Sequence, residues 1–519
     1  MRRQRAAFFA ALFVITGWIP AVAQDITLRS PDGAVEISGT LLGFDGEFYR
    51  VDTKFGELTV DGSGVMCDGP GCPNLSTYVA EIVFSGASVM TDILLPALVE
   101  GFARREQLQA ARIDLDDTRF VYELTRSDAA RPAARFEFRV TTTDEGFADL
   151  LANEADVVLA SREIRPAERR RAEDSGMGDL TDANRSRVLA LDALVPVVAL
   201  TNPVREISTE TLARVFTGEI TNWQSLGGPD APILLHLPGA GSGLGQTAED
   251  RLAAPLNRSL SEDVHRHRRT AQIAASVADD PFGLGLASFA ETAPARALTL
   301  TGSCGFSLNA TRRTVKTEDY PLTSPLFLYL PARRLPKMAR DFLAYTRSAP
   351  AQIVIRRSGF VDQSPEEIAI NDQGDRFANA LLSAGSEIDL AQLKEMTETL
   401  TPLTRLTTSF RFEPGSARLD AQSRSNVAQL ASAIATGTYD ARRLLFVGFS
   451  DGVGAAAANQ NIARARAEAV QAAVLSAIDA GVTDRIDLGV AAFGEALPMA
   501  CDDSDWGRRV NRRVEVWVR

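Results

Sequence analysis

Short apolar segments alternate with helical segments through the middle of the chain. Apolar runs such as 81–84, 156–160 and 195–200 have the length of buried strands, and segments with helical character separate them. This alternation is typical of an α/β sheet with crossover helices. The pattern therefore predicts an α/β domain over residues 78–365.

Different patterns flank this domain on both sides. Residues 25–75 contain short apolar runs separated by Asp-Gly and Phe-Gly turns, which predicts a small β module. Residues 405–519 read as segments in the order β-α-β-α-β-β, which predicts an α+β domain. The polar, helical segment 366–404 is predicted to connect the two larger domains.

The first residues have the pattern of a secretory signal peptide. Arg2, Arg3 and Arg5 precede a short apolar run over 6–19, and an Ala-Val-Ala step follows at 21–23. The run is shorter than the ~20 apolar residues that a membrane-spanning helix needs, and no second such run follows. We therefore expect a signal peptide over 1–23, export to the periplasm, and no transmembrane segment in the mature chain.

Composition narrows the classes of function. The 519 residues carry a formal net charge of −12, which argues against binding of nucleic acid through a basic surface. Only three histidines occur, which leaves little room for a His-rich metal site. No metal site and no cofactor are expected.

The predicted export bears on whether the four cysteines form disulfides. In an oxidising compartment, Cys67 and Cys72 are expected to close a small disulfide loop. Half of a zinc site is the alternative, but no second cysteine pair or nearby histidine completes it. Cys304 and Cys501 either pair across domains or stay free.

Two segments of small residues each follow a predicted strand and precede a predicted helix. Small residues let backbone N–H groups converge on a ligand, and a helix N-terminus adds partial positive charge. A tetrahedral oxyanion fits such a site, and a flexible connection is the alternative. The residues concerned are Ser85, Gly86, Ser88, Gly241, Ser242 and Gly243.

Residues 200–246 resemble the periplasmic phosphate-binding proteins of ABC importers. The resemblance extends over about 80–365 and implies a two-lobed periplasmic binding protein fold of type II. It further implies a hinge, closure over a small anion such as phosphate, and an ABC permease as a candidate partner. The matching residues include Asn202, Pro203, Val204, Phe216, Ile220, Thr221, Asn222, Trp223, Gly227 and Gly228.

Some positions depart from that family. Pro238 and Leu244 stand where the family commonly carries an arginine and a threonine, and Arg162 after Ser161 stands where it often carries an aspartate. Either Ser161 and Arg162 now contact the anion, or Arg162 is a solvated surface residue and the ligand is not phosphate. Ser242 lacks both the Gly-x-Ser-x-Gly setting and a His/Asp partner, so catalysis is not expected.

An acid and a base in the last domain are placed for a zwitterionic ligand. Asp451 follows the apolar strand 444–449, and Arg466 lies about two turns into the next predicted helix. A carboxylate acceptor and a bidentate guanidinium donor in one pocket would bind an ammonium and a carboxylate on one carbon. An internal salt bridge, or two solvated charges, is the alternative.

The residues around this pair resemble the OmpA-like peptidoglycan-binding domain. The resemblance implies that Asp451 and Arg466 bind the amino and carboxylate groups of diaminopimelate in the wall peptide. Asn459 matches the family asparagine at the helix start, while Phe449 and Ser450 replace its histidine and threonine. The matching blocks are 410–420, 447–470, 493–498 and 507–518, and the last of them includes Asn511, Arg512 and Arg513, for which a structural or wall-proximal role is expected.

Together these observations predict an exported binding protein anchored to peptidoglycan and associated with the outer membrane of a Gram-negative envelope. Its middle domain is expected to capture a small anion. The alternative is a structural envelope protein whose middle domain is a scaffold or binds a partner without solute. A hydrolase would need a metal cluster, or a nucleophile with its base, and the sequence shows neither.

Overall fold

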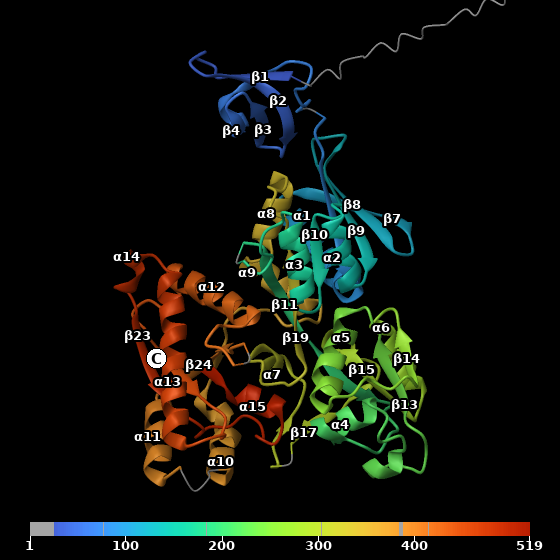
Figure 1. The fold of residues 1–519 in the computed structure, drawn as a ribbon, viewed down its shortest axis with the longest axis vertical. Coiled ribbons are helices and arrows are strands. Elements are labelled where there is room, and N and C mark those ends of the chain that lie inside the picture. Colours follow the sequence, from blue (N-terminus) through green and yellow to red (C-terminus); the bar gives the residue numbers. More distant parts are fainter. Residues whose placement is uncertain (1–24, 76, 183, 303, 384–387, 414) are drawn as a thin grey trace, which may run out of the picture. The chain divides into compact units, whose positions relative to one another are not determined.

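The computed structural model divides into two compact units, Met1–Tyr78 and Val79–Arg519. It describes residues 25–519 apart from 76, 183, 303, 384–387 and 414. The predicted signal peptide lies outside the described residues. Figure 1 gives the order of the helices and strands along the chain.

The first unit is a five-stranded antiparallel sheet in the order β4-β3-β2-β1-β5. The buried residues Ile26, Leu28, Tyr49 and Val51 form its small core. A disulfide between Cys67 and Cys72 closes the loop after the last strand, and the small predicted β module is confirmed. The strands are β1 (Asp25–Arg29), β2 (Glu36–Phe44), β3 (Phe48–Thr53), β4 (Gly56–Asp61) and β5 (Met66–Asp68).

The second unit begins with an α/β lobe whose strands run in the order β19-β10-β6-β9-β8-β7. Its central strands β9, β6 and β10 are parallel, as expected where helices form the crossovers. The strands are β6 (Ala80–Ala87), β7 (Leu108–Asp116), β8 (Arg119–Arg126), β9 (Pro132–Thr141), β10 (Val157–Ala160) and β19 (Thr323–Tyr329). The helices are α1 (Leu95–Arg105), α2 (Thr143–Leu151), α3 (Pro166–Asp174), α8 (Lys337–Tyr345) and α9 (Ala349–Arg357).

A second lobe continues the same sheet through β11, β15, β13 and β14. A separate three-stranded sheet, β12-β17-β18, belongs to the same stretch of chain. The strands are β11 (Ser186–Val198), β12 (Glu206–Ser208), β13 (Leu234–Pro238), β14 (Val264–His267), β15 (Gly283–Ser288), β17 (Thr299–Thr301) and β18 (Ser307–Leu308). The helices are α4 (Thr209–Phe216), α5 (Gly243–Ala248), α6 (Ala271–Asp279) and α7 (Arg312–Lys316).

Strand β11 joins the two lobes. Its first part, Ser186–Ala193, pairs with β19, and its second part, Leu194–Val198, pairs with β15. One strand therefore leaves the first lobe and continues as the sheet of the second, while β19 brings the chain back. The predicted α/β fold with two lobes is confirmed, and the hinge stays a prediction.

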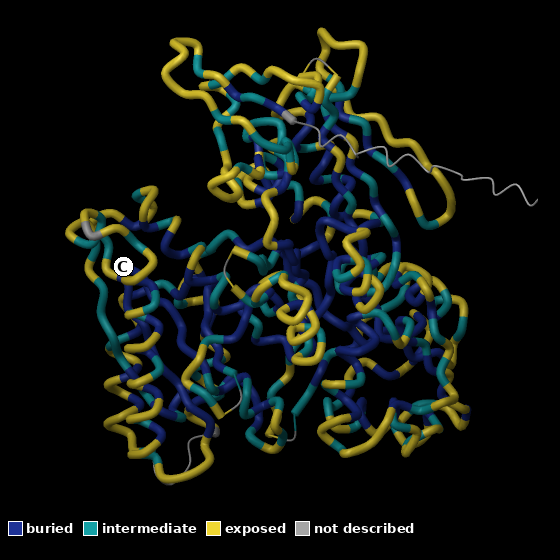
Figure 2. The backbone as a smooth tube through the Cα atoms, turned by 45° about the horizontal axis from the view of Figure 1, so that its top comes forward, coloured by how far each residue is buried: buried dark blue, intermediate teal, exposed yellow. Residues whose placement is uncertain are grey.

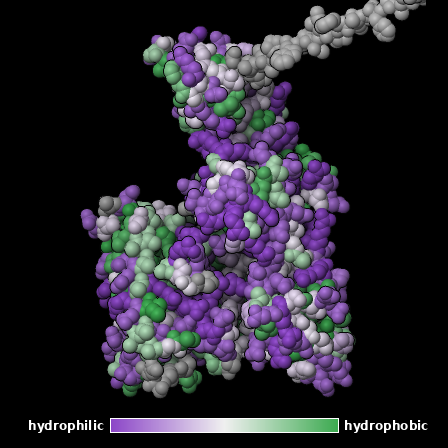
Figure 3. All heavy atoms as spheres, in the orientation of Figure 1, coloured by the Kyte–Doolittle hydropathy of each residue, from purple (hydrophilic) through white to green (hydrophobic). Residues whose placement is uncertain are grey.

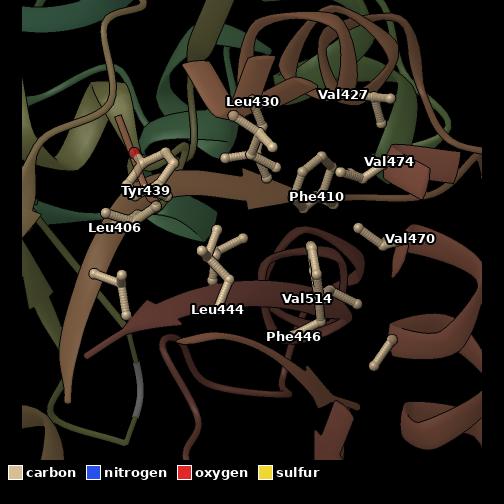
Figure 4. Packing of buried hydrophobic residues seen from close by; sticks show 14 of the residues in the cluster. Leu406, Phe410, Val427, Leu430, Tyr439, Leu444, Phe446, Val470, Val474 and Val514 are labelled. Atoms are coloured by element: carbon tan, nitrogen blue, oxygen red, sulfur yellow. The ribbon is translucent and has the colours of Figure 1, made fainter. Parts of the chain in front are cut away.

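The C-terminal domain has a five-stranded sheet in the order β20-β21-β24-β22-β23. Helices α12 and α13 cover one face, where Leu406, Phe410, Leu430 and Phe446 are among the residues that pack together (Figure 4). The strands are β20 (Glu367–Ile368), β21 (Thr404–Phe410), β22 (Arg443–Phe449), β23 (Asp487–Ala492) and β24 (Arg513–Val518). The helices on this face are α12 (Ala421–Ala435) and α13 (Ala456–Ser476), and α15 (Asp505–Asn511) precedes β24.

The segment predicted to be a connector, 366–404, belongs to the C-terminal domain instead. Strand β20 pairs with β21 at the edge of the sheet. Helices α10 (Gly374–Ser383) and α11 (Leu390–Leu400) carry apolar side chains that pack on the second face of the sheet. These side chains include Leu393 and Met396, which contact the same cluster as Trp517. The helices look polar in sequence because only one side of each is apolar.

Burial follows these layers. The central strands of the sheets are buried, whereas exposed residues gather in loops and on the outer sides of helices (Figure 2). On the face shown in Figure 3, most of the surface is hydrophilic and hydrophobic residues form small separate areas. No helix in the described ranges has the length and apolar character needed to cross a membrane.

Candidate functional site

The C-terminal site lies where α13 passes over the end of β22. Gly448 packs so closely beneath the helix that a Cβ there would lie 1.9 Å from the carbonyl oxygen of Ala463. Asp451 lies three residues beyond Gly448, and Arg466 lies three residues beyond Ala463. The carboxylate of Asp451 is close enough to act electrostatically on Arg466. The fold therefore brings the predicted acid and base into one region.

Arg466 carries the free charge of this region. Among residues that the structure describes, none forms a hydrogen bond or ion pair with its guanidinium, whose Cζ lies 5.4 Å from the centre of the Phe412 ring. Burial and the neighbouring Arg512 guanidinium lower the pKa of Arg466, and Asp451 opposes this shift. An arginine stays protonated at neutral pH, so a half-buried positive charge is left for an anionic partner.

Asp451 is held by Arg512 and not by Arg466. Arg512 donates a hydrogen bond to Asp451 Oδ2, and this carboxylate is largely buried. Sequence reasoning expected a structural or wall-proximal role for Arg512, and the structure puts its guanidinium in direct contact with the predicted ligand-binding acid. The Asn-Arg-Arg block in the sequence drew attention to Arg512. Its ion pair with Asp451 depends on the pairing of β24 with β22, which the sequence does not show.

Asn459 and Asn511 both use their side-chain amides inside the domain. Asn459 is buried and donates a hydrogen bond of 2.6 Å from Nδ2 to Glu495 Oε2, which ties the start of α13 to the loop after β23. Asn511 accepts from the backbone N–H of Met499 at 2.7 Å and from that of Ala500 at 3.1 Å. These contacts give both asparagines a positioning role.

In the middle domain, the two lobes touch directly at the predicted anion site. A methyl group added at Gly243 would lie 2.6 Å from Ser161 Oγ and 2.7 Å from Thr143 Oγ1. Gly241 faces the side chain of Thr142, with a distance of 3.6 Å from its ideal Cβ to Cγ2. Ser161 Oγ itself is buried and has no hydrogen-bond partner in the described structure. Protein atoms therefore occupy this contact in the conformation described.

Ser242 is used as a helix cap. Its hydroxyl accepts a hydrogen bond of 3.0 Å from the backbone N–H of Gly245 and donates one of 2.7 Å to the carbonyl of Gly239. This arrangement is a normal N-cap and explains the local sequence without a ligand.

Arg162 is neither free nor on the surface. Its side chain is 6% exposed and forms ion pairs of 2.5 Å with Asp144 and 2.6 Å with Glu168. Nε donates to Gln246 Oε1, and the remaining N–H groups donate to Glu168 and to the carbonyl of Glu163. All five donors are used, so the expectation of a solvated Arg162 is wrong. Its charge is already balanced by carboxylates from the same lobe.

The first small-residue segment lies within a strand and not in a turn. β6 runs through Ala87, so Ser85 and Gly86 are part of the sheet. Ser85 donates a hydrogen bond of 2.6 Å to Asp149 on α2. Gly86 lies against Leu159, whose carbonyl oxygen would be 2.1 Å from a Cβ. Ser88 is partly exposed, and its carbonyl accepts from Thr91.

Thr142 and Thr143 are residues of this region that sequence reasoning missed. They begin α2, where Thr142 Oγ1 accepts from the backbone N–H of Glu145 and the Glu145 carboxylate accepts from the backbone N–H of Thr142. Thr143 Oγ1 accepts a hydrogen bond of 3.2 Å from the N–H of Ser161. The Thr-x-x-Glu capping box after an apolar strand was the available signal.

The C-terminal domain contacts both lobes. Cys304, in the second lobe, forms a disulfide with Cys501, which answers the pairing that the sequence left open. Arg424 on α12 lies 3.4 Å from Glu163 of the first lobe. Gln429 donates a hydrogen bond of 2.6 Å to Gln363 beyond α9. The domain is therefore fastened to each lobe, and separation of the lobes would strain these contacts.

The three histidines gather on β13 and β14, although they are separated in sequence. His236 Nδ1 lies 2.9 Å from His267 Nε2, and the rings of His265 and His267 are 4.5 Å apart. Burial lowers the pKa of His267 to about 4, so its ring is neutral at pH 7. In the described residues, no group of three or more His, Cys, Asp and Glu side chains is arranged to hold a metal ion.

Comparison with known proteins agrees with this architecture. Residues 122–350 match the model of the PBP superfamily domain, and residues 411–512 match that of the OmpA family. The chain is thus a binding protein that combines a periplasmic-binding-protein domain with an OmpA-family domain. Neither of these families is a family of enzymes.

The relatives match the first of these domains. Protein SphX from Synechococcus elongatus is 27% identical over 48% of this chain and 78% of its own length. The phosphate-binding protein PstS from Staphylococcus haemolyticus is 25% identical over 39% of this chain and 65% of its own length. Among solved structures, an ABC-type phosphate transport receptor from Vibrio cholerae is 18% identical, with a TM-score of 0.40, and the match covers 54% of this chain and 99% of the receptor.

Proposed function

We propose that this protein is exported to the cell envelope and binds peptidoglycan through its C-terminal domain. One observation carries the proposal. Arg466 is a half-buried guanidinium without a partner in the described structure, and the carboxylate of Asp451 is close enough to act on it electrostatically. Diaminopimelate in the wall peptide offers a carboxylate for Arg466 and an ammonium for Asp451, and charge-assisted hydrogen bonds of this kind are strong.

Loss of the Arg466 charge is expected to weaken binding to peptidoglycan sacculi at least tenfold. A hydrogen bond to a charged group contributes about 1.5–3 kcal/mol, which corresponds to a factor of roughly 10–100 in affinity. Arg466→Gln keeps much of the side-chain volume, and co-sedimentation of the mature protein with purified sacculi measures the change.

Arg464→Gln is the matched control for this test. Arg464 is exposed and lies on the same helix, two residues before Arg466. Its replacement by glutamine removes the same charge as Arg466→Gln. The control is expected to sediment with sacculi as the wild type does. If Arg466→Gln sediments equally well while keeping the wild-type melting temperature, the proposed site is wrong.

For the middle domain, capture of a small anion such as phosphate stays a prediction. The second candidate, a scaffold or partner-binding domain without solute, is favoured by the direct contact of Gly243 with Ser161 and Thr143. The saturated donors of Arg162 favour it as well. An anion at this contact would require the lobes to separate against the contacts made by the C-terminal domain.

Phosphate is therefore expected to leave the thermal unfolding of the protein unchanged. A ligand that binds only the folded state raises stability by about 2.7 kcal/mol at a hundred times its Kd, so calorimetry with 10 mM phosphate detects even weak binding. Sulfate at equal ionic strength is the control for a general salt effect. A rise in melting temperature specific to phosphate would support anion capture and exclude the scaffold.

Binding to the wall would also confine the middle domain. An import receptor that diffuses to an ABC permease delivers its solute, whereas an anchored one stays near the peptidoglycan. We therefore propose a role in sensing or envelope organisation at the peptidoglycan and outer membrane, with an ABC permease as a candidate partner. Localisation to the periplasm rests on the predicted signal peptide and on the two families.

A further inference from the structure

A cavity of about 340 Å³ lies where the two lobes meet the C-terminal domain. Its walls come from β19, from Glu318 shortly after α7, from the π-helix Glu249–Ala253 after α5, and from the start of α12. The volume is within the range of small-ligand sites. Residues of the C-terminal domain line it, so it differs from the contact between Gly243 and Ser161 described above.

Two ionisable groups in this cavity, a guanidinium and a carboxyl group, have no hydrogen-bond partner among the described residues. Arg251, in the π-helix after α5, lines the cavity, and no described residue forms a hydrogen bond or ion pair with its guanidinium. Glu318 also lines it, and its Oε1 is buried without a hydrogen-bond donor. The two side chains influence each other electrostatically, yet they form no ion pair. Buried polar groups are normally bonded, so each of these needs an explanation.

The backbone of Glu318 is also unusual. Its φ is +55°, in the left-handed region that a residue with a long side chain rarely adopts. Such conformations persist where the surrounding structure enforces them, and they are common at ligand sites. Here Arg411 of the C-terminal domain donates a hydrogen bond of 2.6 Å to the Glu318 carbonyl, which holds the residue in place. The carboxyl group is thereby fixed at the cavity wall.

The other charges around the cavity are already paired. Arg162 is saturated, Arg165 lies 3.2 Å from Asp250, and Arg509 lies 4.0 Å from Asp420. The groups left over are one guanidinium, one carboxyl group and the buried Oε1 of Gln422, which lacks a donor. Gln422 is 4% exposed and its Nε2 is occupied by Asn426. A ligand must therefore bring both an acceptor and a donor.

We propose that this cavity binds a small zwitterion, an amino acid or a short peptide, with its carboxylate on Arg251 and its ammonium on Glu318. A simple anion would satisfy Arg251 but leave Glu318 and Gln422 without donors and add charge near Asp420. A simple amine would leave Arg251 unpaired. A zwitterion pairs both charges, and its remaining N–H groups are suited to Gln422.

Glu318 should also make binding dependent on pH. Burial, and then the neighbouring Asp420, raise the pKa of Glu318 to about 8, while Arg411 and Arg509 act in the opposite direction and Asp319 adds to the rise. The carboxyl group is thus mostly protonated at pH 7 in the empty cavity. Because an ammonium ion favours the carboxylate, the affinity is expected to rise between pH 6 and pH 8.

Isothermal titration of the full mature chain tests the proposal. The probes are glycine, L-glutamate and the dipeptide L-alanyl-D-alanine, compared with acetate, phosphate and ethylamine, which each carry one kind of charge. Saturable binding of at least one zwitterion is expected, with at least tenfold weaker binding in Arg251→Gln and in Glu318→Gln. Arg251→Lys is the second variant if Arg251→Gln does not fold, and it should also bind more weakly.

The proposal does not depend on peptidoglycan binding, and Arg466→Gln separates the two. This variant is expected to retain the zwitterion titration while it loses sedimentation with sacculi. The inference is overturned if no zwitterion binds, if acetate or phosphate binds as tightly as the zwitterions, or if folded Arg251 and Glu318 variants bind like the wild type.

Discussion

Replacing Glu515 with glutamine is expected to lower the free energy of unfolding by about 3–5 kcal/mol, a large part of the 5–15 kcal/mol typical of a domain. Glu515 is fully buried in β24 and accepts hydrogen bonds of 2.5 Å from Arg376 and 2.7 Å from Arg513. Arg405 Nε lies 3.3 Å from its other carboxylate oxygen. Glutamine keeps the shape but removes the charge, and it leaves guanidinium groups buried without their counter-charge.

The pH dependence of this cluster follows from the same contacts. Burial alone would raise the pKa of Glu515, but Arg376, Arg405 and Arg513 outweigh it and hold the pKa far below its ordinary range. A lowered carboxyl pKa stabilises the fold at pH values above the ordinary value of 4.5, and this stability is lost as the pH falls towards the folded-state pKa. The difference between variant and wild type should therefore persist at neutral pH and shrink in acid.

Urea unfolding at pH 7, followed by tryptophan fluorescence, measures this effect. Trp517 is a suitable reporter because its Nε1 donates a hydrogen bond of 3.1 Å to Glu515. Glu398→Gln on α11 removes the same charge from an exposed position and is expected to stay within about 0.5 kcal/mol of the wild type. An unchanged unfolding midpoint for Glu515→Gln would show that the buried arginines do not need this carboxylate.

Removing the disulfide between Cys304 and Cys501 is expected to destabilise the second unit by about 2–5 kcal/mol. The two cysteines are 197 residues apart, so their link restricts a long loop of the unfolded chain. In the folded state it fastens the C-terminal domain to the second lobe. The double variant Cys304→Ser/Cys501→Ser should therefore unfold at a lower temperature and expose the interface between these parts earlier.

The other disulfide provides the control. Cys67 and Cys72 are only 5 residues apart and lie in the first unit, so Cys67→Ser/Cys72→Ser is expected to cost about 2 kcal/mol there. It should leave the transition of the second unit unchanged. Scanning calorimetry without reductant compares the two double variants. Equal shifts of the second unit's transition would contradict the role given to the link between Cys304 and Cys501.

Local patterns were sufficient for the elements of the C-terminal domain. The predicted strand 444–449 and the helix predicted to follow it correspond to β22 and α13. Strand β22 is a continuous apolar run. The buried residues of α13 recur every three or four residues, which is the spacing of one helix face: Asn459, Ala463, Ala467, Val470 and Val474. The same reasoning wrongly made 366–404 a connector. Its two helices have narrow apolar stripes, and the sequence does not show that these stripes pack on the second face of the C-terminal sheet.

Local patterns did not settle the partners of charged residues. Arg162 finds Asp144 and Glu168, and Asp451 finds Arg512 from another part of the domain. A charge looks the same in sequence whether it faces water, a ligand or a buried carboxylate. For this reason the spacing of Asp451 and Arg466 predicted that they lie close together. It did not predict that Arg512 would form an ion pair with Asp451.

The amino-acid order alone indicated the classes of domain and the acid and base of the last domain, and the resemblance of 200–246 to periplasmic phosphate-binding proteins implied the two lobes. These features depend on periodicity and motif spacing, which are properties of neighbouring residues. The closed contact at Gly243, the buried cluster around Glu515 and the cavity between Arg251 and Glu318 were decided by tertiary structure. Each joins segments far apart in the chain, and their energies depend on burial and distance, which exist only once the chain has folded.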